Sequence, residues 1–285
     1  MFPHWYAVVQ PFLLAIEPGP IIEIGVFDGS TTERLAEIAM DRNTVVNAVD
    51  PAPQFNVDEY ERRFAGHFRF YREKSHDVLE RVEPASAVLI DGDHNWYTVH
   101  GELTRLERVA TSSGTHFPLV FFHDVEWPYA RRDMYYEPDA IPPEWRRPWS
   151  RQGLRWGDRH LAPEGEGVDA GLAKAVEEGG PRNGVLTAIE DFMRESEIDL
   201  DLRIVSGSNG VGILASQNLL DAAPTVRDRW ARLRSAEFLT DQTMRLAEVA
   251  MGASIAGAEA RHRIERLEGE LKRARAELAA AEAHA

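Results

Sequence analysis

The sequence predicts an α/β protein with a doubly wound, mostly parallel sheet and a C-terminal helical extension. Between Ile21 and about Ile213, short apolar runs alternate with amphipathic segments, which is typical of strand–helix units in a parallel sheet. The run Ala87–Ile90 is apolar throughout, as expected for a strand buried on both faces. Gly207–Gly210 separates two late apolar runs and predicts a hairpin, so the sheet closes with an antiparallel pair.

The remaining elements follow from the same patterns. Strands are predicted at 21–24, 45–49, 68–71, 87–90, 119–122, 200–205 and 211–214. Helices are predicted at 31–40, 60–64, 77–82, 96–110 and 184–195. Ser30 or Thr31 is expected to cap the first of these helices, with Glu33 supporting its first turn.

Two segments depart from the alternation and define the predicted domains. Residues 126–183 are rich in Pro, Trp, Tyr and Arg and are too long for an ordinary connection, so we expect a substrate lid within a domain at 1–222. Packing of this segment on the domain's own surface fits the same composition. The tail at 223–285 carries apolar residues at 3-4 spacing, which fits a dimerising coiled coil and a single solvated helix equally: Ile264, Leu267, Leu271, Ala274, Leu278 and Ala281.

Composition excludes several classes of partner and chemistry. The formal net charge of −15 over 285 residues argues against a nucleic-acid or anionic-membrane partner, because both require basic surface. The absence of cysteine excludes disulfides, thiolate metal sites and cysteine nucleophiles, and it fits a reducing cytoplasm. The apolar N-terminal stretch lacks a basic region before it and is too short to span a bilayer. We therefore expect a cytoplasmic protein with a small-molecule substrate.

The turn after the first strand has the features of a nucleotide-binding loop. Gly25 and Gly29 form a G-x-x-x-G pattern, which lacks the middle glycine of the dinucleotide fingerprint. Glu23 and Asp28 would repel a pyrophosphate and suit a ligand that carries positive charge. Asp50, at the end of the second strand, lies about 20 residues beyond Gly29, the usual distance for an acid that binds ribose hydroxyls. Tight-turn packing is the alternative explanation for the glycines.

These residues resemble a known family. Residues 22–30 resemble motif I of class I S-adenosylmethionine-dependent methyltransferases, and the similarity covers roughly residues 15–215. More narrowly, Asp91–His94 and Phe122–Asp124 resemble methyltransferase family 24, which is related to metal-dependent sugar O-methyltransferases. The resemblance implies a seven-stranded sheet of order 3-2-1-4-5-7-6 with an antiparallel last strand, and S-adenosylmethionine as cofactor. It also implies a set of cofactor-binding residues: Glu23, Gly25, Phe27, Asp28, Gly29, Ser30, Asp50, Ser75 and His76.

The fourth and fifth strands, neighbours in this order, both end on acids. Asp91 follows the fourth strand and Asp124 the fifth, and neighbouring strands lie about 4.8 Å apart. Two buried carboxylates that close together require a cation, and oxygen ligands favour Mg²⁺ or Mn²⁺. His123 is the third candidate ligand and tilts the preference toward a transition metal. The related enzymes carry an acidic pair at this position, so His123 is a departure from their pattern.

Catalytic roles are predicted for Asp91 and His94. The imidazole of His94 titrates near neutral pH and is expected to act as general base, the role of a histidine at this offset in the related sugar enzymes. Asp93 is left open between ligand, a partner that orients His94, and a cap for the following helix. In the alternative interpretation, Asp91 belongs to a simple turn and His123 is a hydrogen-bonded core residue.

The start of the predicted lid supplies the candidate acceptor contacts. Aromatic rings stack on sugar faces and arginines pair with carboxylates or phosphates, so we predict five substrate-binding residues: Trp127, Tyr129, Arg131, Arg132 and Tyr135. The sequence thus favours a metal-dependent O-methyltransferase acting on a hydroxyl of a sugar or another polyol-bearing small molecule. The competing hypotheses are a different enzyme on the same scaffold and a non-catalytic partner protein that acts through its C-terminal helix, which could also join two copies of the chain.

Overall fold

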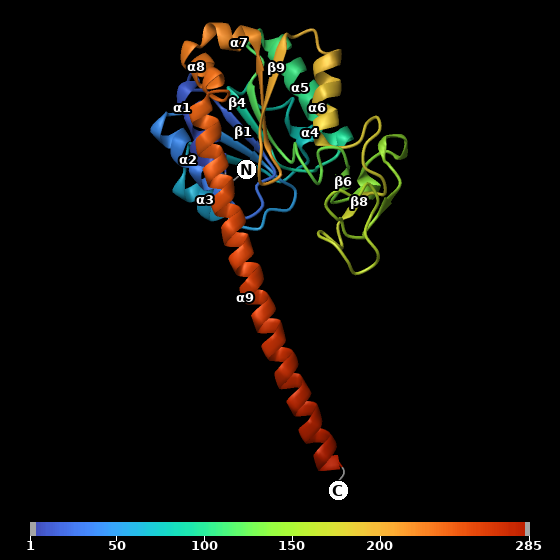
Figure 1. The fold of residues 1–285 in the computed structure, drawn as a ribbon. Coiled ribbons are helices and arrows are strands. Elements are labelled where there is room, and N and C mark those ends of the chain that lie inside the picture. The colour runs from blue at the N-terminus through green and yellow to red at the C-terminus, as the bar shows by residue number, and fades with distance from the viewer. Residues whose placement is uncertain (1–3, 283–285) are drawn as a thin grey trace. The chain divides into compact units, whose positions relative to one another are not determined.

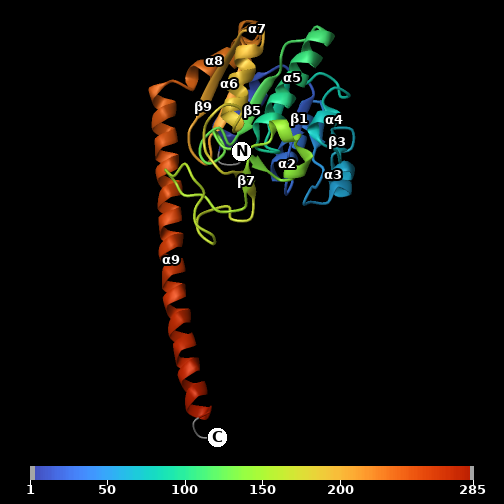
Figure 2. The ribbon, with the colours of Figure 1, turned by 90° about the vertical axis from the view of Figure 1, so that its right-hand side faces the viewer.

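The computed structural model describes residues 4–282, and the chain divides into two compact units between Ala231 and Arg232. The division falls about one helix later than the predicted boundary after residue 222. The first unit holds a seven-stranded sheet of order β3-β2-β1-β4-β5-β10-β9 with helices on both faces (Figures 1 and 2). β10 runs antiparallel to both of its neighbours, so the predicted order and the antiparallel last strand are confirmed.

The strands are short and largely buried. Their bounds are β1 (Ile21–Ile24), β2 (Val46–Val49), β3 (Phe68–Tyr71), β4 (Ala87–Ile90), β5 (Leu119–His123), β9 (Leu200–Val205) and β10 (Val211–Ser216). The strands β1, β2, β4 and β10 are buried at every position, which confirms the prediction made for β4 from its continuous apolar run. In register, Ile24 lies beside Ile90, which lies beside Phe122. The residues that follow these three strand ends therefore meet at one edge of the sheet.

The helices of the first unit connect the strands and cover the sheet. They are α1 (Gln10–Ala15), α2 (Ser30–Asp41), α3 (Val57–Arg63), α4 (Ser75–Val78), α5 (Trp96–Ser113), α6 (Val185–Glu195), α7 (Gln217–Ala222) and α8 (Pro224–Arg232), preceded by a π-helical turn at Trp5–Val9. The predicted cap of α2 is wrong, because Gly29 occupies the N-cap position with φ +81° and no side chain caps the helix. α5 is capped by Asn95, whose side chain accepts a hydrogen bond from the Thr98 amide at 2.9 Å.

The inserted segment at 126–183 forms an antiparallel three-stranded sheet of order β6-β8-β7, separate from the main sheet. Its strands are β6 (Met134–Tyr135), β7 (Trp149–Ser150) and β8 (Ala173–Ala175), with 3₁₀ turns at Pro138–Ala140 and Pro143–Trp145. Asp133, fully buried at its base, accepts hydrogen bonds from the amides of Trp96 and Gly184, both at 2.7 Å. The insertion is therefore anchored to the first turns of α5 and α6.

The second unit consists mainly of α9 (Ala236–Glu282), a single long helix. Its apolar residues at the predicted 3-4 spacing, Ile264, Leu267 and Leu271, are about half exposed. Side chains beyond residue 275, including those of Leu278 and Ala281, lie outside the described residues. Association of two copies through this helix stays a prediction. No helix in the described range is both long enough and apolar enough to cross a membrane.

Glu102 on α5 leads to a prediction about pH and stability. The side chain is fully buried, and burial raises the pKa of its carboxyl to about 8 although the Ser75 hydroxyl donates to it at 2.6 Å. The unfolded chain releases this proton near pH 4.5, so the stability that Glu102 contributes is complete below that pH and is lost as the pH rises toward 8. We expect Glu102→Gln to remove this loss.

Urea unfolding at pH 5 and at pH 9 tests this expectation. Between pH 5 and pH 9 the free energy of unfolding of the wild type should fall by on the order of 3 kcal/mol more than that of Glu102→Gln. Glu61→Gln, on the exposed surface of α3, is the matched control and should follow the wild type at both pH values. An equal difference between Glu102→Gln and the wild type at pH 5 and pH 9 would contradict the prediction.

Candidate active site

A cavity of about 440 Å³ opens at the carboxyl ends of β1, β4 and β5. This edge of an α/β sheet is where ligands bind. The lining comes from four parts of the chain: the loop after β1, the ends of β4 and β5, the insertion, and the turn between β9 and β10. The lining residues are Glu23, Gly25, Val26, Phe27, Asp28, Ser30, Thr31, Leu89, Asp91, His94, His123, Asp124, Tyr129, Met134, Tyr136, Asp169, Leu172 and Asn209.

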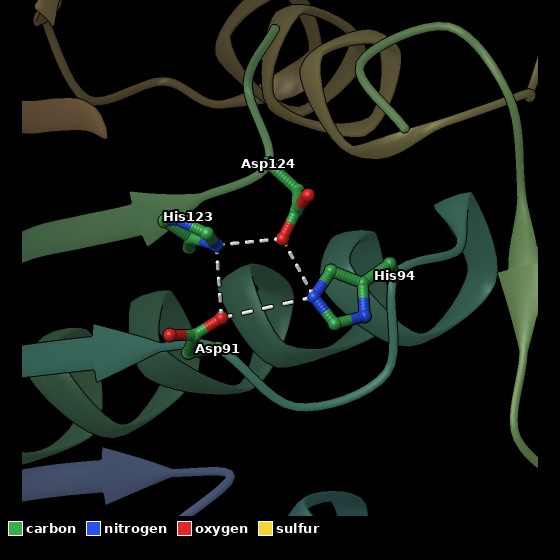
Figure 3. Close-up of side chains that lie close together, drawn as sticks. All are labelled: Asp91, His94, His123 and Asp124. Atoms are coloured by element: carbon green, nitrogen blue, oxygen red, sulfur yellow. Dashed lines mark hydrogen bonds and ion pairs between the residues drawn. The ribbon is translucent and has the colours of Figure 1, made fainter. Parts of the chain in front are cut away.

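Asp91, His94, His123 and Asp124 converge on one point of this cavity (Figure 3). Asp124 Oδ2 lies 2.8 Å from His94 Nε2 and 2.7 Å from His123 Nδ1. Asp91 Oδ1 lies 3.3 Å from His123 Nδ1 and 3.7 Å from His94 Nε2. One ligand atom from each residue falls within 4.8 Å of the other three. We call these four residues the tetrad; the structure brings together every residue predicted as metal ligand or base.

The tetrad is balanced in charge. Burial lowers the pKa of His94, but the Asp124 and Asp91 carboxylates outweigh it and hold that pKa well above its ordinary value. His123 shows the same opposition, and the two carboxylates raise its pKa to about 9. Burial acts to raise the pKa of Asp91 and Asp124, yet the imidazoles hold both well below the usual range. Two carboxylates and two imidazolium groups thus compensate one another.

The loop after β1 is shaped by packing within the protein. Gly25 has φ +81°, and a Cβ there would lie 2.2 Å from the carbonyl oxygen of Asp91. Gly29 also has φ +81°, and its Cβ would lie 2.9 Å from the ring of Phe55. Packing within the protein therefore requires glycine at both positions, and Gly25 in addition lines the cavity. A role of either glycine in cofactor binding stays a prediction. Phe27 lines it too, 65% exposed and in a left-handed conformation at φ +45°.

Three acidic residues lie in or beside the loop after β1, and each makes different contacts. Asp50 accepts hydrogen bonds from the amides of Val26 at 2.9 Å and Ala52 at 2.7 Å, so it fixes the loop and is not among the lining residues. Asp28 lines the cavity and accepts from the Ser30 amide at 3.0 Å. Glu23 lines it from β1, and its Oε2 atom is buried without a hydrogen-bond partner in the described structure. Burial raises the pKa of the Glu23 carboxyl to about 8, so an ammonium or sulfonium ligand beside it would favour its ionised form.

Ser75 and His76 lie outside the cavity lining. The Ser75 hydroxyl bonds to Glu102, and the His76 Nε2 atom lies 2.9 Å from the carbonyl oxygen of Thr98 on α5. His76 also packs edge-to-face on Tyr97, with ring centroids 5.5 Å apart. Both side chains have partners within the protein, so the role of either residue in cofactor binding stays a prediction.

Among the predicted acceptor contacts, only Tyr129 lines the cavity, where its hydroxyl donates to Asp169 at 2.6 Å. Trp127 packs edge-to-face on Trp156. The other three use their polar groups inside the fold: Arg131 pairs with Glu190 at 2.6 Å, Arg132 donates to the carbonyls of Ala175 and Arg159, and Tyr135 donates to Asp133. These bonds satisfy polar groups that the insertion would otherwise bury unpaired.

The predicted site residues leave out eight lining residues, namely Val26, Thr31, Leu89, Met134, Tyr136, Asp169, Leu172 and Asn209. One sequence signal could have identified Met134 and Tyr136: side chains alternate along a strand, so the residues on either side of Tyr135 face the opposite way from it.

The structure also shows the contacts of Asp93, whose role the sequence left open. Its carboxylate accepts from Asn95 Nδ2 at 2.6 Å and from the Tyr136 amide at 3.3 Å. Asp93 thus ties the insertion to the start of α5.

Comparisons with known proteins identify a domain family and solved structures to which the chain is similar. Residues 22–125 match the methyltransferase domain family Methyltransf_24, and no curated protein sequence matches the chain. A putative rRNA methylase from Clostridium thermocellum aligns at 7% identity over 74% of this chain and 94% of its own, with a TM-score of 0.44. The Podospora anserina methyltransferase PaMTH1, solved with S-adenosylhomocysteine, aligns at 12% identity over 74% of this chain and 76% of its own, with a TM-score of 0.44.

The matched segment runs from β1 to two residues beyond β5, so it contains the cofactor loop and every residue of the tetrad. Beyond the matched segment, β10 pairs antiparallel with β5, as the strand order of the resemblance implied. Residues 22–125 are therefore a family 24 methyltransferase domain, and the chain is an S-adenosylmethionine-dependent methyltransferase.

Proposed function

We propose that this methyltransferase acts on a hydroxyl of a sugar or another polyol-bearing small molecule and that it requires a divalent metal. The observation that carries the proposal is the position of the tetrad, which lies in the same cavity as the loop after β1. A cofactor held by that loop would share the cavity with the tetrad, so a hydroxyl could be activated beside the methyl group.

The donor set fits a divalent metal. Asp91 Oδ1, His123 Nδ1 and Asp124 Oδ2 face a common point and combine two carboxylate oxygens with one imidazole nitrogen. Carboxylates suit Mg²⁺ and Mn²⁺, and the imidazole shifts the preference toward Mn²⁺. When bound there, the cation would lower the pKa of an acceptor hydroxyl.

His94 is the proposed general base. It is buried, lines the cavity and lies at hydrogen-bond distance from Asp124, whose carboxylate orients its ring. The two carboxylates favour the protonated ring of His94, and a dication on Asp91 and Asp124 would weaken that effect and favour the neutral ring. In the proposed reaction the neutral ring of His94 accepts the hydroxyl proton, and the acceptor oxygen forms a bond to the methyl carbon. The bond from that carbon to sulfur breaks with its electron pair, which leaves S-adenosylhomocysteine. Positioning of the two reactants supplies most of the rate.

The cavity favours an acceptor without negative charge. Among the described residues that line it, none is lysine or arginine, whereas five are Asp or Glu. The predicted arginine contacts to a carboxylate or phosphate therefore have no support in this cavity. Tyr129 and Tyr136 place aromatic rings beside His94, with centroids 5.7 Å and 6.1 Å away. Such rings suit the apolar face of a sugar.

Calorimetry with S-adenosylhomocysteine tests the cofactor half of the proposal. We expect the wild type to bind and Asp50→Ala to bind at least tenfold more weakly, because the amides of Val26 and Ala52 lose their acceptor and the loop loosens. Asp58→Ala, at the start of α3 and away from the cavity, is the matched control. Equal affinity of Asp50→Ala and the wild type would remove Asp50 from the cofactor site.

Transfer of labelled methyl groups to a panel of sugars and glycosides tests the other half. Removal of divalent ions with a chelator should stop the transfer, and added Mn²⁺ should restore it. Transfer that survives thorough chelation would rule out the metal. Transfer to matched amines or carboxylates but never to hydroxyls would rule out O-methylation.

A further inference from the structure

The turn between β9 and β10 contacts two members of the tetrad, His123 and Asp124, through the atoms that point away from the other members. The carbonyl oxygen of Ser208 lies 3.0 Å from His123 Nε2, and the side-chain amide of Asn209 donates to Asp124 Oδ1 at 2.9 Å. In each case the contacted atom is the one that does not face the tetrad, since His123 Nδ1 and Asp124 Oδ2 make the contacts within it. Sequence separations of 85 residues make both contacts invisible to local patterns.

Each contact occupies one of the two polar atoms of the side chain and leaves the other atom directed toward the tetrad. A carbonyl oxygen can only accept, so His123 Nε2 carries a hydrogen and Nδ1 faces the tetrad as the nitrogen available for coordination. The Asn209 amide nitrogen can only donate, so it holds Asp124 Oδ1 and leaves Oδ2 directed inward. Asp124 itself adopts a left-handed conformation at φ +59°.

The turn is itself fixed in place. Glu126 receives a hydrogen bond from the Gly207 amide at 2.8 Å, and its own amide donates to the carbonyl of Asn209 at 2.8 Å. His4, buried at the other side, lies 2.7 Å from the Gly207 carbonyl oxygen. Ser208 and Asn209 adopt left-handed conformations at φ +47° and +69°. The turn is therefore a rigid support rather than a free loop.

We infer that the Gly207–Gly210 turn is the outer shell of the metal centre and that Asn209 is a positioning residue for Asp124. The inference rests on the proposed function, because it concerns how the metal ligands are oriented. Histidine ligands in metal sites donate their second ring N–H to a carbonyl or carboxylate, and loss of such partners weakens metal binding by about 10- to 100-fold. With His123 Nδ1 fixed inward, the site takes a first-row transition dication such as Mn²⁺ in preference to Mg²⁺.

Asn209→Gly isolates the amide contact. Glycine adopts φ +69° without strain, so the variant keeps the turn and loses only the donor to Asp124. The control is Asn43→Gly, because Asn43 is also a left-handed asparagine, at φ +52°, and lies outside the cavity. Mn²⁺ affinity of the full chain is measured by electron paramagnetic resonance of free Mn²⁺, and S-adenosylhomocysteine affinity by calorimetry.

We expect Asn209→Gly to bind Mn²⁺ about tenfold more weakly than the wild type, with S-adenosylhomocysteine affinity unchanged and Asn43→Gly indistinguishable from the wild type in both. A wild type that binds Mn²⁺ together with an Asn209→Gly variant within twofold of it would overturn this inference and leave the proposed function intact. A wild type that binds neither Mn²⁺ nor Mg²⁺ would overturn the metal requirement and this inference with it. Tighter binding of Mg²⁺ than of Mn²⁺ by the wild type would overturn the stated preference.

Discussion

Replacing His94 by glutamine is expected to lower the kcat of methyl transfer by about 100- to 10,000-fold. Glutamine keeps a polar group near Asp124, whose Oδ2 lies 2.8 Å from His94 Nε2, but it cannot accept a proton at neutral pH. His94 is the member of the tetrad that lies beside the rings of Tyr129 and Tyr136, and no other described side chain in the cavity offers a base at that position. The measurement is transfer of labelled methyl at saturating cofactor.

Two further measurements separate the role of base from that of ligand. Mn²⁺ affinity should be unchanged in His94→Gln, since Asp91, His123 and Asp124 remain; a loss of tenfold or more would make His94 a ligand instead. His100→Gln is the matched control, because His100 stacks on Trp96 outside the cavity and should retain wild-type turnover. A His94→Gln variant within tenfold of the wild type would contradict the assignment.

The sequence predicted the positions of those site residues that directly follow the end of a predicted parallel strand. Asp91 and Asp124 could be placed together because each follows a short buried strand, and parallel strands bring their carboxyl ends to one edge. The glycine loop could be located in the same way, and the strand order followed from the family resemblance. These features depend on short-range patterns and on a topology with few alternatives.

The contacts of individual side chains were not predictable from those patterns. Arg131 resembles an anion-binding residue in sequence, yet its guanidinium pairs with Glu190, which α6 presents 59 residues later. Asn209 was expected only as a turn former, and its amide reaches Asp124 across the sheet edge. Asp50 has the spacing of a ribose ligand, and its carboxylate accepts from the amide of Val26, in the loop after β1, and from that of its near neighbour Ala52. The partners Glu190, Asp124 and Val26 are set by packing between segments that are distant in the sequence.

Lys174 leads to the second large prediction, which concerns the stability of the insertion. The residue lies in β8 with no exposed surface, and burial lowers the pKa of its ammonium. Its Nζ atom donates to the carbonyls of Gln152, Asp169 and Leu172 at 2.8, 2.7 and 2.9 Å. Three bonds match the three hydrogens of the ammonium, so one side chain gathers three carbonyls of the insertion. The Asp169 carbonyl also accepts from the Leu172 amide at 3.2 Å.

We expect Lys174→Met to lower the free energy of unfolding by about 2–4 kcal/mol, because the carbonyls of Gln152 and Leu172 lose this donor and each such loss costs about 1–3 kcal/mol. The matched control is Lys74→Met, which removes an exposed pair with Glu137 at 2.7 Å and should cost at most about 1 kcal/mol. Urea unfolding of both variants at pH 7 gives the comparison. A loss below about 1 kcal/mol in Lys174→Met would show that the carbonyls find water instead.

Lys174→Met should also weaken binding of the acceptor, because it loosens a segment of the insertion that lines the cavity. Asp169 and Leu172 line the cavity, and their carbonyl oxygens are two of the three that Lys174 holds. Asp169 also accepts the hydrogen bond from the Tyr129 hydroxyl, so a loosened segment would release Tyr129 as well. Because the loop after β1 lies at another part of the lining, S-adenosylhomocysteine affinity should hold while KM for the acceptor rises. An equal loss of affinity for both ligands would mean that Lys174 supports the whole domain, not the insertion alone.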